Sequence, residues 1–108
     1  MTRVGLVQLS VDETESVADR VVRTLALSTD AAHHADIVML PELWPTGAFD
    51  LDLGLEHAQS IEGPLVAALS DVAATTGTWI HGGSFVELAG EDEYFNTSVI
   101  FNPQGDLV

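Results

Sequence analysis

Apolar residues dominate two short stretches near the start of the chain. Residues 3–9, RVGLVQL, and residues 36–41, DIVMLP, are apolar on both faces of a two-residue period. This pattern is typical of strands that are buried on both faces of a sheet. We therefore predict two short buried strands in the first part of the chain.

A helical pattern separates these two strands. The spacing predicts a helix over residues 13–34, with Asp12 as its N-cap and Glu15 reaching back to it in a capping box. Arg20 and Arg23 fall mostly outside its buried stripe. That stripe, at helical spacing, consists of Val17, Val21, Leu25, Ser28 and Ala32. A strand, a helix and a second strand in this order predict a βαβ-like unit with parallel strands.

The next segment, residues 42–62, has no strong period, and we interpret it as a loop that holds a short helical turn. Pro64 then begins a predicted helix, because a proline at the first helical position loses no hydrogen bond. Gly77 stands where a left-handed C-terminal cap belongs. The predicted buried stripe of this helix consists of Leu65, Leu69, Val72 and Ala73.

Two further strands complete the pattern. Residues 78–86, TWIHGGSFV, predict a third strand with a bend at its Gly-Gly pair, and an acidic turn follows. Residues 95–102, FNTSVIFN, alternate and predict a fourth strand. The residues on one of its faces are Phe95, Thr97, Val99 and Phe101. The whole pattern predicts a layered α/β fold, with a mixed sheet that starts parallel and ends in an antiparallel hairpin.

The charge of the chain is strongly negative. Its 108 residues, enough for one domain, contain 17 acids and 3 arginines but no lysine, giving a net charge of −14. Such a field repels phosphate groups, so we expect neither nucleic acid nor a membrane surface as a partner. The absence of cysteine excludes disulfides and a thiol nucleophile within these residues. With no signal-peptide pattern and no run near the roughly 20 apolar residues of a membrane span, a cytoplasmic protein is expected.

Glu42 is the strongest candidate for a catalytic residue. It follows Pro41 directly after the second predicted strand, and an aromatic-rich loop with Trp44 and Phe49 comes next. Reaction sites in open α/β sheets gather beyond the carboxyl ends of the strands. Burial against Trp44 and Phe49 would suit Glu42 to general-base work, and both aromatics are candidates for substrate binding. The residue pattern leaves open that Glu42 only caps a helix or pairs with an arginine.

Other patterns point less clearly to chemistry. The histidines have no spacing typical of a metal site, so we predict none. HGGS, residues 81–84, resembles the oxyanion loop of some serine hydrolases, but the serine motif G-x-S-x-G is absent. We interpret Gly82 and Gly83 as places where a neighbouring backbone or ligand comes close.

Four blocks of the chain together resemble the N-terminal part of a carbon–nitrogen hydrolase of the nitrilase superfamily. The blocks are RVGLVQLSVD, ADIVMLPELWPTG, IEGPLVAALSDVAATTGTWIHGGSFVE and YFNTSVIFNPQGDLV. LPELWPTG is the most specific, because few other families place Pro-Glu at this strand end. The order and spacing of the blocks extend the resemblance over nearly the whole chain.

The resemblance implies a four-layer α-β-β-α sandwich with a largely buried sheet, of which residues 1–108 form the N-terminal portion of a single domain. It implies catalysis by a glutamate, a lysine and a cysteine, and Glu42 matches the glutamate. The expected lysine and cysteine come after Val108, and the chain has neither residue type. We therefore expect that this chain alone is inactive.

For the complete protein, the resemblance implies hydrolysis of a small amide or nitrile by a thiol mechanism. It implies no cofactor, and it implies a homodimer. The alternative interpretation is a non-catalytic α/β module that binds or regulates another molecule.

Overall fold

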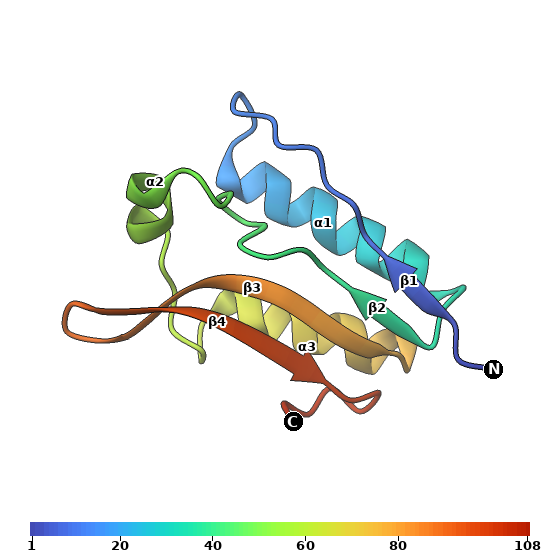
Figure 1. Ribbon diagram of the computed structural model, residues 1–108. Helices are drawn as coiled ribbons and strands as arrows, with labels where there is room; N and C mark the ends of the chain where they lie inside the picture. The colour runs from blue at the N-terminus through green and yellow to red at the C-terminus, as the bar shows by residue number, and fades with distance from the viewer.

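The computed structural model describes residues 1–108, and its strands form one four-stranded sheet in the order β1-β2-β3-β4. β1 pairs with β2 and β2 with β3 in parallel, while β3 and β4 form an antiparallel hairpin. The predicted α/β fold with a mixed sheet is thus confirmed (Figure 1). The elements in chain order are β1 (Val4–Leu6), α1 (Val17–Ala32), β2 (Ile37–Met39), α2 (Leu51–Glu56), α3 (Pro64–Thr76), β3 (Trp79–Gly90) and β4 (Glu93–Phe101).

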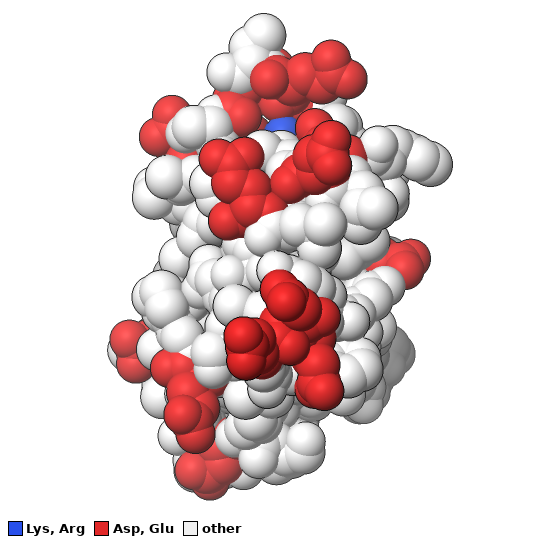
Figure 2. Space-filling view, turned by 90° about the vertical axis from the view of Figure 1, so that its left-hand side faces the viewer, with Lys and Arg blue, Asp and Glu red and all other residues white.

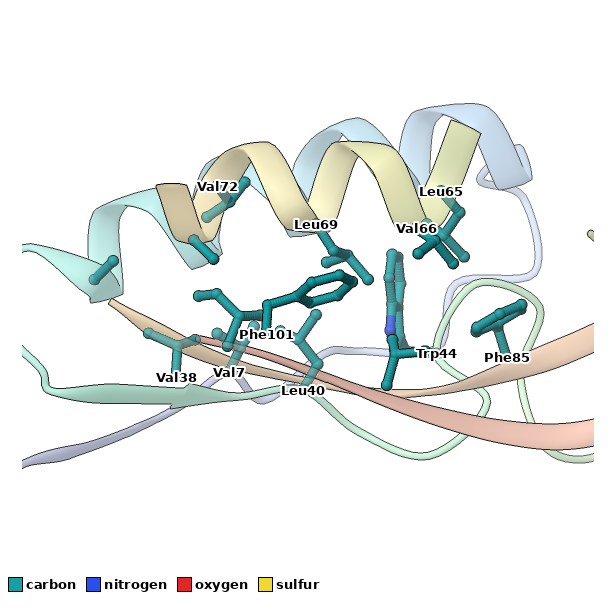
Figure 3. Close-up of a cluster of buried hydrophobic side chains, with 14 residues drawn as sticks. Val7, Val38, Leu40, Trp44, Leu65, Val66, Leu69, Val72, Phe85 and Phe101 are labelled. Atoms are coloured by element: carbon teal, nitrogen blue, oxygen red, sulfur yellow. The ribbon is translucent and has the colours of Figure 1, made fainter. Parts of the chain in front are cut away.

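The core lies between the sheet and two helices that cover the same face of it. Figure 3 shows α1 and α3 side by side above the strands, with apolar side chains filling the space between. Val38, Ile80 and Leu69 are fully buried there, and Phe101 is nearly so. Burial of this apolar surface is the main force that holds the helices to the sheet.

The opposite face of the sheet is open. Leu6 is 75% exposed and Trp79 is 41% exposed, although both belong to strands. The expectation that residues 3–9 are buried on both faces is therefore wrong for this structure, because no other segment of the chain covers the second face. In Figure 1 the viewer looks onto this open face, with both long helices behind the strands.

Helix α3 follows its sequence signals closely. Pro64 stands at its start, and Gly77 ends it in a left-handed conformation with a φ of 63°. The four apolar residues predicted to be buried are buried, together with Val66. The short helical turn expected in the preceding loop is α2, whose N-cap Asp50 accepts a hydrogen bond from the Leu53 N–H.

Helix α1 begins later than predicted. Its N-cap is Ser16, whose hydroxyl accepts a hydrogen bond from the Asp19 N–H, so the predicted capping box of Asp12 and Glu15 is wrong. Asp12 instead accepts two hydrogen bonds from Thr14, and Glu15 pairs with two arginines. Both carboxylates therefore have partners other than the backbone N–H groups at the start of the helix.

The buried side of α1 is also more polar than predicted. Its buried residues are Arg20, Thr24, Ser28 and Ala32. Thr24 and Ser28 each donate a hydrogen bond of 2.7 Å to the carbonyl four residues earlier, so their hydroxyls are satisfied inside the helix. Val21 and Leu25 are only half-buried, although they pack against the core.

All three arginines are paired with acids. Arg3 lies 3.9 Å from Asp36, and both Arg20 and Arg23 pair with Glu15. The rest of the acids have no arginine partner. Figure 2 shows one face with several separate groups of acidic side chains and only a trace of basic surface. No helix has the length and apolar character needed to cross a membrane.

The contacts of Glu15 predict a loss of stability in acid. Hydrogen bonds from Arg23 and then Arg20 hold the pKa of the Glu15 carboxyl below its usual value of 4.5. Because this pKa is lowered by folding, the stabilisation is present above about pH 4.5 and is lost as pH falls through the lowered pKa. We expect the melting temperature of Glu15→Gln to fall less steeply with acid than that of the parent.

Thermal melts over a pH series from about 6 to about 2 test this expectation. Glu62→Gln is the matched control, because Glu62 is exposed and forms no ion pair. Parent and Glu15→Gln curves that fall in parallel with pH would contradict it.

Candidate active site

Glu42 lies three residues beyond the end of β2, on the loop that connects β2 to α2 (Figure 1). Its side chain is exposed and borders a hollow of about 290 Å³ that opens on the uncovered side of the sheet. The other residues lining this hollow are Leu40, His81, Gly83, Ser84, Asn96 and Ser98. Glu42 neither caps a helix nor pairs with an arginine, which were the two structural alternatives.

The loop around Glu42 is hydrogen-bonded to β3 through the residues directly before and after Glu42. The Ser84 N–H donates to the Pro41 carbonyl at 3.2 Å, and the Leu43 N–H donates to the Ser84 hydroxyl at 2.8 Å. The Trp44 indole N–H donates to the Gly82 carbonyl at 2.9 Å. These bonds hold the backbone of Glu42 in one place although its side chain is exposed.

The two glycines of HGGS allow this close approach. A Cβ atom at Gly83 would stand 2.0 Å from the Pro41 carbonyl oxygen, and Gly83 has a φ of 63°. A Cβ at Gly82 would stand 2.9 Å from a methyl carbon of Val99. The interpretation of both glycines as sites of close approach is confirmed, and what approaches Gly83 is the loop that carries Glu42.

One side chain contacts the Glu42 carboxylate. The Asn96 amide N–H donates to Glu42 Oε1 at 2.9 Å, and Glu42 Oε2 has no hydrogen-bond partner. Sequence reasoning missed Asn96. The only available signal was the alternation of β4, which places Asn96 and Ser98 on the face opposite the buried Val99.

The expected burial of Glu42 against Trp44 and Phe49 is not found. Trp44 is 4% exposed, and its ring lies in the core and points toward α3 (Figure 3). Phe49 is fully exposed. The hydrogen bond of the indole to the Gly82 carbonyl holds the Trp44 ring in this buried position.

A second, larger hollow lies on the other side of this loop. It measures about 600 Å³ and lies between residues 9–20 and residues 41–53, so that Glu42 borders both hollows. Trp44 and Phe49 both line it. Its one arginine, Arg20, is already bound to Glu15 and to the Asp12 carbonyl.

The histidines do not converge on Glu42 as a metal site. His33 and His57 stand at the ends of α1 and α2, and no three His, Asp or Glu side chains come close enough to hold a metal ion. Of the four histidines, only His81 lines the hollow that Glu42 borders. Its Nδ1 accepts a hydrogen bond from the Gly83 N–H at 3.2 Å, so a neutral His81 carries its proton on Nε2.

Known proteins share both the sequence and the fold of this chain. It is 37% identical to the 2-oxoglutaramate amidase of Paenarthrobacter nicotinovorans over 96% of this chain and 36% of that protein. It is 35% identical to the omega-amidase NIT2 of Homo sapiens over 98% of this chain and 37% of that protein. Saccharomyces cerevisiae Nit3, a solved member of branch 10 of the nitrilase superfamily, aligns with 98% of this chain and 41% of its own at a TM-score of 0.82 and 27% identity.

The chain thus spans a little over a third of the length of the two amidases. The family model described as carbon-nitrogen hydrolase matches residues 3–108, which is nearly the entire chain. This match and the amidase relatives confirm the resemblance that the four sequence blocks indicated. The chain belongs to the carbon–nitrogen hydrolase family of the nitrilase superfamily.

Proposed function

We propose that this chain supplies the general base, Glu42, to an enzyme that hydrolyses a small amide by a thiol mechanism. The observation that carries the proposal is the position of Glu42. Its backbone is fastened to β3, and its carboxylate borders an open hollow with Oε2 unpartnered. A carboxylate held in this way can accept a proton from a group placed in the hollow.

The mechanism requires two more groups, a cysteine and a lysine, from outside residues 1–108. The cysteine thiol gives its proton to Glu42, and its sulfur attacks the amide carbon. The lysine stabilises the negative oxygen that develops. Glu42 then passes the proton to the departing amine, which leaves a thioester. Water hydrolyses this thioester to the acid and restores the thiol.

The names of the relatives favour an amide over a nitrile as substrate. They include a 2-oxoglutaramate amidase and omega-amidases. Phe49, fully exposed at the rim of the larger hollow, is available to contact a substrate. Trp44 lines the same hollow, but its burial means that it shapes the wall and offers little surface of its own.

An ammonia-release assay on a panel of small amides and nitriles tests the proposal. The complete enzyme, in which residues 1–108 are joined to the part that carries the lysine and cysteine, should release ammonia and lose this activity after thiol alkylation. The non-catalytic alternative predicts no release by the complete protein.

The 108-residue chain alone should release no ammonia in the same assay. Glu42 has no thiol to activate, because the chain contains no cysteine, and it has no lysine to stabilise an oxyanion. The control is the Glu42→Gln variant of the same chain. Release by the parent chain well above this control would show that the proposed lysine and cysteine are not needed.

Three expectations from the sequence stay predictions. They are a homodimer of the complete protein, a cytoplasmic location, and the lack of a nucleic-acid or membrane partner. The charge of the chain supports the last of these, since it has only three arginines and no lysine, and each arginine lies near a carboxylate.

A further inference from the structure

The contact between Asn96 and Glu42 joins two residues that are 54 positions apart in the chain. The Asn96 amide occupies Glu42 Oε1 at 2.9 Å, while Oε2 is left without a partner. The two oxygens of the carboxylate are therefore not equivalent in this structure. A hydrogen bond to an ionised group is among the stronger polar contacts in a protein.

β3 holds both residues of this contact, through its pairing with β4 on one side and its hydrogen bonds to the Glu42 loop on the other. Asn96 pairs with Val86 across the β3–β4 hairpin, and nearby Ser98 donates a hydrogen bond to the Gly83 carbonyl at 2.6 Å. On the other side, the Leu43 N–H donates to the Ser84 hydroxyl. β3 thus fixes the distance between the amide of Asn96 and the backbone of Glu42.

We propose that Asn96 is a positioning residue that holds the Glu42 carboxylate in its proton-accepting orientation. An exposed glutamate has several rotatable bonds and otherwise samples many orientations. By engaging Oε1, Asn96 limits this motion and leaves Oε2 as the oxygen that takes the thiol proton. This inference rests on the proposed function, because it assigns Glu42 the role of general base.

The sharpest variant is Asn96→Asp, which keeps the shape of the side chain and replaces the donor by an acceptor. We expect kcat of the complete enzyme to fall by about 10- to 100-fold, since small displacements of a catalytic group have effects of this size. KM should stay near the parent value, because the contact orients the base and does not bind the substrate. Asn96→Ala should also lower kcat, but less, because it removes the donor without adding repulsion.

Thr97→Val is the matched control. Thr97 is the next residue on β4, and its hydroxyl donates to Glu87 at 2.6 Å, so the variant removes a similar side-chain bond away from Glu42. It should leave kcat unchanged. Thermal unfolding of the Asn96 variants should match that of Thr97→Val, which separates a positioning role from a loss of fold.

A second measurement does not depend on activity. In the NMR spectrum of the folded protein, the side-chain amide protons of Asn96 should shift in Glu42→Gln, because the charged acceptor becomes neutral. They should not shift in Glu87→Gln. An Asn96 amide signal that does not respond to Glu42→Gln would overturn the inference even if the Asn96 variants failed to fold.

The outcomes separate this inference from the proposed function. If Glu42→Gln abolishes turnover while Asn96→Asp and Asn96→Ala keep the parent kcat, Asn96 has no positioning role, but the proposed function stands. If Glu42→Gln itself keeps the parent kcat, both are wrong. Loss of kcat in all three variants, with Thr97→Val unaffected and KM preserved, supports both.

Discussion

Glu42→Gln should lower kcat of the complete enzyme by about 10²–10⁴-fold, the usual effect of removing a general base. Glutamine keeps the shape of the side chain, and its Oε1 can still accept the hydrogen bond from Asn96. It cannot take a proton from a thiol at neutral pH. Steady-state ammonia release on the best amide of the panel measures the effect.

The fold should survive this change, because Glu42 is exposed and makes only one side-chain hydrogen bond. Thermal unfolding of Glu42→Gln should therefore match that of Glu56→Gln, an exposed acid on α2 that forms no ion pair. Turnover by Glu42→Gln close to that of Glu56→Gln would show that Glu42 is not the base.

Elements with strong local signals could be predicted from the sequence. Helix α3 has a proline at its start, a glycine at its end and a regular apolar stripe, and its structure agrees at each point. Helix α1 was predicted with Asp12 as its N-cap, but its N-cap is Ser16. Glu15, which the predicted capping box required, forms ion pairs with Arg20 and Arg23 instead. Such a preference for partners several residues away is not visible in a local pattern.

The site was predictable only in part, for a similar reason. Glu42 could be named as a candidate because it follows a predicted strand and a proline, which is a property of the local sequence. Asn96 could not, because its contact depends on the register between β3 and β4 and on the path of a loop 54 residues earlier. The inward turn of Trp44 likewise depends on a carbonyl of β3.

Gly82 and Gly83 shape β3 and also allow the Glu42 loop to approach it. β3 changes register with β4 between His81 and Ser84, at the bend where the loop of Glu42 comes closest. A bulge of this kind re-aims the strand and frees its backbone groups for other partners. Here the freed groups of Gly82 and Ser84 bind the loop, so the same bend that shapes the strand also places the candidate base.

Gly83→Ala should destabilise the fold by about 3–5 kcal/mol, a large effect for one methyl group. Two costs add at this position. The left-handed conformation disfavours any side chain, and the new Cβ would stand 2.0 Å from the Pro41 carbonyl oxygen, where nonbonded atoms do not fit. Relief requires the loop to move away from β3, which breaks its bonds to Ser84. Denaturant unfolding measures the change in free energy.

Gly77→Ala is a close control, because Gly77 has the same φ of 63° and a Cβ added there would meet no atom within 4 Å. It should lose only the conformational contribution, about 1–2 kcal/mol. The difference between the two variants then isolates the contact with Pro41. In the complete enzyme, Gly83→Ala should also lower kcat, since Glu42 moves with the loop, whereas Gly77→Ala should not. Equal losses of stability in the two variants would show that the Pro41 carbonyl does not lie as close to Gly83 as the structure places it.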